Sequence, residues 1–146
     1  MIQSTAKVTF HFLDVKFPFR NRTVLKEFLT KLFKREGKAL ESLNYIFCTD
    51  EYLLQMNRDF LQHDYYTDII TFELAGGKKA PTQGEIYISI DRVRDNAVNF
   101  DSSFTRELHR VIFHGALHLC GFKDKNAAQQ KLMRQKEDEY LNLYFS

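Results

Sequence analysis

Two histidines stand four residues apart in an amphipathic helical segment, and a carboxylate follows closely. These residues are His114, His118 and, six positions further on, Asp124. Side chains at positions i and i+4 of a helix share one face, so both imidazoles can aim at one point. Gly121 ends the helix, and the chain can then turn back to bring the carboxylate there. The spacing predicts a mononuclear metal site with three protein ligands, which leaves a position for water as in catalytic zinc sites.

Two alternatives accompany this prediction. Histidines with this spacing also occur on helices that bind no metal, and the spacing alone leaves both interpretations open. Cys120 follows His118 by two residues and is another candidate ligand. However, a side chain two positions along a helix points to a different face. Nitrogen and carboxylate ligands both suit zinc, so one Zn²⁺ per chain is the expected cofactor, with another divalent ion as the alternative.

Further polar residues accompany the pair. Glu107 and Arg110 recur at the same helical steps as the histidines and so belong on the same face. They are candidate catalytic residues, or a pair that supports the histidines from behind; an ordinary helix salt link is the other interpretation. Asp64, Thr67 and Asp68 precede a strand-like segment. For Thr67 and Asp68, a turn that holds loop backbone is the preferred interpretation, and the rim of a metal cleft is the alternative.

The segment around the histidines resembles a family signature. HGALHLCGFKD (114–124) is similar to the HGxLHLxGYDH signature of the YbeY family, bacterial metal-dependent endoribonucleases implicated in ribosomal RNA maturation. MNRDFLQHDYYTDIITFEL (56–74) and GEIYIS (84–89) resemble two further segments of that family. The resemblance implies a single-strand endoribonuclease that acts in ribosomal RNA maturation and ribosome quality control. It also implies a ribosomal RNA precursor as substrate and small-subunit ribosomal proteins as candidate partners.

The sequence departs from the family pattern at two positions. By resemblance, His114 and His118 match the first two metal-binding histidines, and Asp124 stands where the family has a third. A carboxylate there still supplies a ligand to zinc, through oxygen. However, it lowers the net charge of the metal centre and its Lewis acidity. Leu61 stands where the family commonly has an arginine suited to stabilising a developing phosphorane charge. The candidate basic replacements are Arg92, Arg94, Arg110, Lys123 and Lys125.

Two other functions compete with RNA cleavage. A metalloprotease of the HExxH type uses the glutamate of that motif as its general base. Gly115 stands at the equivalent position, which argues against a protease. The other competitor is a non-catalytic ribosome assembly or RNA-binding factor whose metal only stabilises the fold. Leu61 and Asp124 are the reason to keep that alternative, because both differ from the family pattern.

Patterning along the chain predicts an α+β fold. We expect a four-stranded sheet with one hairpin, covered by about five helices, with the metal site on a long helix and the loop after it. Alternation predicts strands at 7–13, 43–48, 68–74 and 84–90, with 75–83 as the hairpin loop. Helical spacing predicts helices at 21–36, 91–99 and 124–144, a short helix capped by Asp50, and a long one from the caps at 101–103 to Gly121.

Length and composition place the chain among globular proteins. Its 146 residues fit a single domain, 1–146, and 44% of them are apolar and 27% charged. The net charge of +2 is too small to indicate a surface that binds nucleic acid over most of its area. No apolar run approaches the ~20 residues that span a bilayer, and the first residues do not look like a signal peptide. Cys48 and Cys120 lie far apart, so a reduced, cytoplasmic protein without membrane partners is expected.

Overall fold

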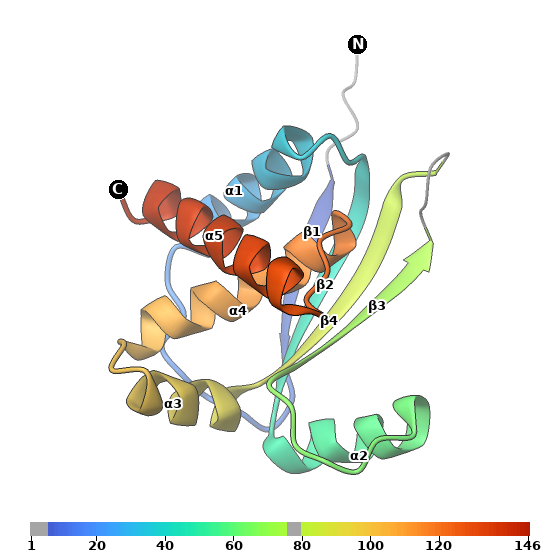
Figure 1. The fold of residues 1–146 in the computed structure, drawn as a ribbon, viewed down its shortest axis with the longest axis vertical. Helices are drawn as coiled ribbons and strands as arrows, with labels where there is room; N and C mark the ends of the chain where they lie inside the picture. Colours follow the sequence, from blue (N-terminus) through green and yellow to red (C-terminus); the bar gives the residue numbers. More distant parts are fainter. Residues whose placement is uncertain (1–5, 76–79) are drawn as a thin grey trace.

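The computed structural model describes residues 6–75 and 80–146, and Figure 1 shows their arrangement. The strands are β1 (Lys7–Phe12), β2 (Leu40–Cys48), β3 (Ile69–Ala75) and β4 (Thr82–Ser89). The helices are α1 (Arg22–Arg35), α2 (Asp50–Leu61), α3 (Ile90–Asn99), α4 (Phe104–Leu119) and α5 (Ala127–Tyr144). The predicted α+β class, with a four-stranded sheet, is confirmed.

The four strands form one mixed sheet in the order β1-β2-β4-β3. β2 runs parallel to both of its neighbours, β1 and β4, whereas β3 pairs antiparallel with β4 as the predicted hairpin. The pairing of the strands places one residue of each side by side across the sheet: Phe10, Tyr45, Ile86 and Thr71. Since neighbouring partners share a face, these residues belong to the side on which the core forms.

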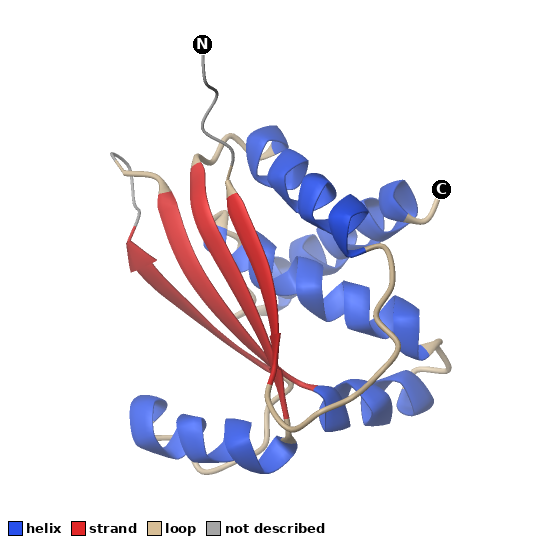
Figure 2. Ribbon diagram, turned by 180° about the vertical axis from the view of Figure 1, so that it is seen from behind, coloured by secondary structure: helices blue, strands red, loops and turns tan. Residues whose placement is uncertain are grey.

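Helices gather on one side of the sheet. Figures 1 and 2 show α1, α3, α4 and α5 on that side and α2 at one end of the sheet. The buried Tyr45 hydroxyl on β2 donates a hydrogen bond to the Ile112 carbonyl on α4 at 2.8 Å, which ties the long helix to the sheet. The apolar face of α4 also packs into this core: Leu108, Ile112 and Leu119 are buried, and Phe104 is half-buried against it.

α4 lies unusually close to the sheet at Gly115. A Cβ atom placed there would stand 2.9 Å from the side chains of both Ile69 on β3 and Ile86 on β4. These distances are shorter than ordinary van der Waals contact, so only glycine fits without a shift of its neighbours.

Two predicted boundaries near the hairpin are wrong. The sequence pattern continues the fourth strand to Ile90, but this residue begins α3, because the Ser89 hydroxyl accepts a hydrogen bond from the Arg92 N–H at 3.2 Å and caps the helix. The segment 75–83 is expected to be a loop, yet Ala75 ends β3, and Thr82 and Gln83 belong to β4. Pairing with β2 extends the strand there. Residues 76–79 of that expected loop lie outside the described residues.

Two predicted helix starts also need correction. Thr49 rather than Asp50 caps α2, since its hydroxyl accepts from the Tyr52 N–H at 3.2 Å. The last helix begins at Ala127 instead of Asp124, with the Asn126 side chain accepting from the Gln129 N–H at 2.9 Å. Asp124 therefore lies in the loop between α4 and α5. In residues 6–75 and 80–146, no helix is long and apolar enough to cross a membrane.

Candidate metal centre

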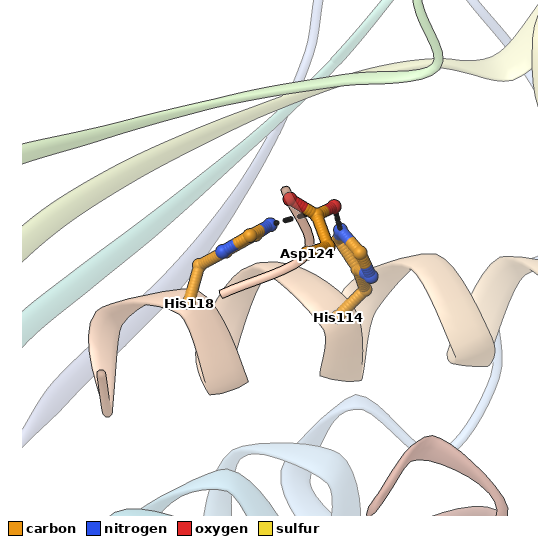
Figure 3. Close-up of side chains that lie close together, drawn as sticks. All are labelled: His114, His118 and Asp124. Atoms are coloured by element: carbon orange, nitrogen blue, oxygen red, sulfur yellow. Dashed lines mark ion pairs between the residues drawn. The ribbon is translucent and has the colours of Figure 1, made fainter. Parts of the chain in front are cut away.

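The two histidines project from successive turns of α4 toward a single point. The ring centroids of His114 and His118 lie 4.5 Å apart, with an interplanar angle of 85°. Asp124 comes from the loop after the helix, and its Oδ2 lies 3.4 Å from the Nε2 atom of each ring. Figure 3 shows the carboxylate between the two imidazoles. The structure thus brings together the three residues that the spacing selects.

A tight turn after α4 places the carboxylate. Gly121 adopts a φ of 103°, which side chains with a Cβ rarely adopt, and its N–H donates to the His118 carbonyl at 3.0 Å. The Phe122 N–H then donates to the Leu117 carbonyl at 3.0 Å. These bonds close the end of the helix and reverse the chain, so that Asp124 faces back toward the histidines.

Each imidazole is oriented by a partner at its other nitrogen. His114 Nδ1 lies 2.6 Å from Glu137 Oε2, and His118 Nδ1 lies 2.9 Å from the Phe122 carbonyl oxygen. A carboxylate and a carbonyl only accept hydrogen bonds, so both Nδ1 atoms are donors. In the neutral tautomer the lone pair of each ring is therefore on Nε2, which faces Asp124.

These donors fit a divalent cation. The three ligand atoms all lie within 4.8 Å of one another. A tetrahedral zinc site with bonds of about 2.0–2.1 Å separates its ligand atoms by roughly 3.3 Å, close to the 3.4 Å between Asp124 Oδ2 and each histidine Nε2. Two lone pairs and a carboxylate that face one another are suitable ligands for a metal cation. The residues present thus suit a metal with nitrogen and oxygen ligands.

A second layer of charge from α5 stands behind His114. Arg110 Nη1 donates to Glu137 Oε1 at 3.0 Å, and its Nη2 donates to Asp138 Oδ1 at 2.7 Å. Glu107 is buried, and its Oε1 lies 3.9 Å from Arg110 Nε. Arg110 is therefore more than a partner in a helix salt link. It holds the carboxylate that orients His114, and this favours the supporting role over the isolated ion pair.

Burial and the neighbouring carboxylates shift the pKa of His114 in opposite directions. Burial lowers the pKa of His114, but the neighbouring carboxylates Glu137, Asp68 and Asp124 outweigh it, and the net shift is upward. The pKa of His118 is lowered, first by burial and then by the charge on His114. Burial raises the pKa of the Asp68 carboxyl. The surplus of negative charge around the two rings favours a cation at their meeting point.

The centre opens into a cleft of about 710 Å³. Its walls come from β3, the ends of α2 and α3, and the facing sides of α4 and α5. Thr67 and Asp68, interpreted from the sequence as turn residues, both line it, and Asp68 Oδ2 accepts a hydrogen bond from Asn96 at 3.3 Å. Thr67 also keeps its expected local contact, since its hydroxyl donates to the Ile69 carbonyl at 3.2 Å.

Of the basic residues proposed as replacements for the family arginine, Arg110 alone is among the described cleft-lining residues. Arg92 pairs with Asp50 on α2 instead, at 2.9 Å. Leu61 does line the cleft, as does Arg134, which sequence reasoning missed. The sequence assigns no role to Glu137, which orients His114. Both residues lie on α5, so their place in the site depends on how that helix packs.

Neighbouring positions on α4 face elsewhere. Gly115 stands where a metalloprotease carries its glutamate, and a Cβ there would lie 2.9 Å from Ile69 and Ile86, so no side chain fits without a shift of its neighbours. Cys120 is half-buried against the core, and burial raises the pKa of its thiol to about 12. A thiol that resists ionisation is a poor metal ligand. Neither residue adds a group to the metal centre.

The chain is similar in sequence to proteins of one family and in fold to a solved structure. The family profile described as endoribonuclease YbeY matches residues 9–144. Proteins named endoribonuclease YbeY from Cytophaga hutchinsonii and Porphyromonas gingivalis are 52% and 44% identical; the alignments cover 89% and 93% of this chain and 90% and 89% of theirs. A solution structure of a Thermotoga maritima protein is similar, with a TM-score of 0.61 and 29% identity over 94% of this chain and 89% of that one.

Proposed function

The chain belongs to the endoribonuclease YbeY family, and we propose that it is a metal-dependent endoribonuclease that cuts single-stranded RNA in ribosomal RNA maturation and ribosome quality control. The observation that carries the proposal is the convergence of His114, His118 and Asp124 at the floor of the cleft. Named relatives supply the reaction class, and the three converging ligands supply a chemical means for it in this chain.

Zinc is the metal that we propose for these ligands, one ion per chain. Two imidazole nitrogens and a carboxylate oxygen suit it, and three protein ligands leave coordination open. When bound, such an ion supplies Lewis acidity toward a phosphoryl oxygen and toward water. Glu137 would fix the tautomer of His114, and Phe122 that of His118, as their hydrogen bonds do now.

Arg110 and Glu107, both candidates from the sequence, enter the proposal as positioning residues. Arg110 is largely buried and bonded to Glu137 and Asp138, so it acts on the centre through Glu137. Glu107 neutralises part of the Arg110 charge. Neither role requires contact with the substrate, and both would keep the metal-binding face of α4 rigid.

The proposed substrate is a single-stranded segment of a ribosomal RNA precursor. An unpaired strand reaches a cleft of this size without melting a duplex. Small-subunit ribosomal proteins are the proposed protein partners, and the cytoplasm is the proposed location. Cys48 and Cys120 are both free thiols, which suits a reducing compartment.

The test combines metal content with cleavage. We expect about one zinc per chain by elemental mass spectrometry, less in Asp124→Ala, and loss of single-strand RNA cleavage in a folded His114→Ala variant. Cleavage that persists in His114→Ala would point to a contaminating nuclease or another site. A protein that binds ribosomal RNA but never cuts it, and that only melts at a lower temperature after His114→Ala, would be an assembly factor with a structural metal.

A further inference from the structure

The cleft is poor in free positive charge for a site that would take RNA. Its described walls carry five carboxylates and two guanidinium groups: Asp68, Glu73, Glu107, Asp124 and Glu137 against Arg110 and Arg134. A phosphodiester strand carries a negative charge on each phosphate, and a protein binds it mainly by neutralising those charges. One metal ion at the floor of the cleft would offset only part of this imbalance.

Arg110 is already committed to carboxylates. Its side chain is 13% exposed, and its two terminal nitrogens donate to Glu137 at 3.0 Å and Asp138 at 2.7 Å. Glu107 adds a third carboxylate at 3.9 Å. A phosphate would have to compete with Glu137 and Asp138 for the N–H groups of Arg110, and displacing the buried Glu137 would leave a carboxylate unpaired, which is costly.

Arg134 is in the opposite situation. Its side chain is 56% exposed while still lining the cleft, and its Nη1 lies 3.9 Å from Glu137 Oε1, beyond hydrogen-bond distance. The planar guanidinium offers paired N–H donors that match two oxygens of one phosphate. In the described cleft wall, this guanidinium is the cationic group with donors to spare.

The position of Arg134 also couples it to the metal centre. It precedes Glu137 by three residues on α5, so both side chains project from neighbouring points of one helix face. Glu137 in turn holds His114 by the 2.6 Å hydrogen bond. The helix that orients a metal ligand therefore also fixes where the free guanidinium lies relative to that ligand.

We propose that Arg134 binds a phosphate of the RNA strand in the cleft and so supplies, from α5, the positive charge that the apolar Leu61 on α2 does not. The inference rests on the proposed function, since it assumes an RNA substrate. It assigns a substrate-binding residue that the sequence did not single out.

The experiment compares Arg134→Gln with Lys131→Gln. Lys131 is exposed on the same helix and is not among the cleft-lining residues, so its replacement removes an equal charge outside the cleft. Binding of a labelled single-stranded 2′-O-methyl oligonucleotide to zinc-loaded protein is followed by fluorescence anisotropy at several salt concentrations. Zinc content and melting temperature are measured for each variant.

We expect Arg134→Gln to bind about tenfold more weakly than wild type, as for loss of one charge-assisted contact. The slope of log affinity against log salt should become shallower by about 0.7, the value for one single-strand phosphate contact. Zinc content should not change. Arg134→Lys should keep the salt slope but lose several-fold in affinity, because lysine retains the charge without the planar fork.

Equal affinity and salt slope in Arg134→Gln and Lys131→Gln would overturn the inference, as would wild-type protein that does not bind the oligonucleotide. Lost zinc in Arg134→Gln would also overturn it, by showing that Arg134 acts on the metal site. Failure of the proposed function is a separate result. Zinc-loaded wild type that cuts no single-stranded RNA would refute the nuclease, while the binding comparison would still decide the role of Arg134.

Discussion

Replacing Glu137 with glutamine tests whether α5 controls the metal centre. Glu137 is 5% exposed, accepts the Nδ1–H of His114 at 2.6 Å, and accepts from Arg110 at 3.0 Å. A hydrogen bond to a charged group contributes about 1.5–3 kcal/mol, and a neutral amide oxygen retains part of it. We therefore expect a loss of roughly 1.4–2.7 kcal/mol, or 10–100-fold in zinc affinity, as for other groups that orient metal-bound histidines.

The assay is competition for zinc against a chromogenic chelator. Asp138→Asn is the matched control, because it removes the adjacent carboxylate, which accepts from Arg110 at 2.7 Å rather than from a histidine. We expect the control to bind zinc within about threefold of wild type, since its ion pair is half exposed and worth little. Thermal melts with and without zinc give a second readout, because a ligand stabilises the folded state by an amount that rises with the logarithm of its affinity.

Two results would refute this reasoning. Wild-type affinity in Glu137→Gln would show that His114 needs no orienting partner to bind the ion. An equal loss of affinity in Glu137→Gln and Asp138→Asn would show that net negative charge near the centre matters, and that the hydrogen bond to His114 does not.

Three further predictions concern other parts of the chain. His109 is buried, and burial lowers its pKa. Its stabilising effect is present above about pH 6.5 and is lost as the pH falls through the lower folded-state value, so His109→Phe should lose less stability than wild type between pH 7 and 5 in urea titrations. Gly115→Ala should lower the free energy of unfolding by up to about 2 kcal/mol, because overpacking costs about 1–3 kcal/mol against about 1 kcal/mol of helix propensity; a higher urea midpoint would contradict the close packing. Asp124→His should keep one zinc and move the acidic limb of the cleavage pH profile to lower pH, since neutral imidazole leaves more charge on the metal; an unmoved limb would speak against Asp124 as a ligand.

The sequence was sufficient to locate the ligand group because its geometry is local. Helical periodicity places His114 and His118 on one face, and the glycine after the helix returns the chain within a few residues. The hairpin is local as well, because its two strands follow each other in the sequence. Strand boundaries were less accurate, since β4 gains Thr82 and Gln83 through pairing with β2, a strand that is distant in the sequence.

The supporting part of the site depends on long-range packing. Glu137 and Arg134 reach the cleft only because α5 lies against α4, and nothing in their own spacing reveals which of the many charged residues of α5 faces that helix. Asp68 was interpreted as a turn residue for a similar reason. Its backbone carbonyl accepts a hydrogen bond across the hairpin from the Ser89 N–H at 2.9 Å, while its carboxyl group lines the cleft and accepts from Asn96 on α3. Both partners are distant in the sequence, so local spacing does not reveal them.

The close approach of α4 to the sheet affects both the packing of the helix and the side chains that it can present to the metal centre. Gly115 lies between the two histidines in sequence, and the contact it allows with Ile69 and Ile86 seats the helix that carries both ligands on a rigid support. The same contact leaves no room for a side chain at the position where a metalloprotease carries its base. A helix packed in this way can present a metal clamp, but the charges that act on the substrate must come from another element. In the proposed function α5 meets that requirement, since it contributes Glu137, which orients His114, and the exposed Arg134 in the cleft wall.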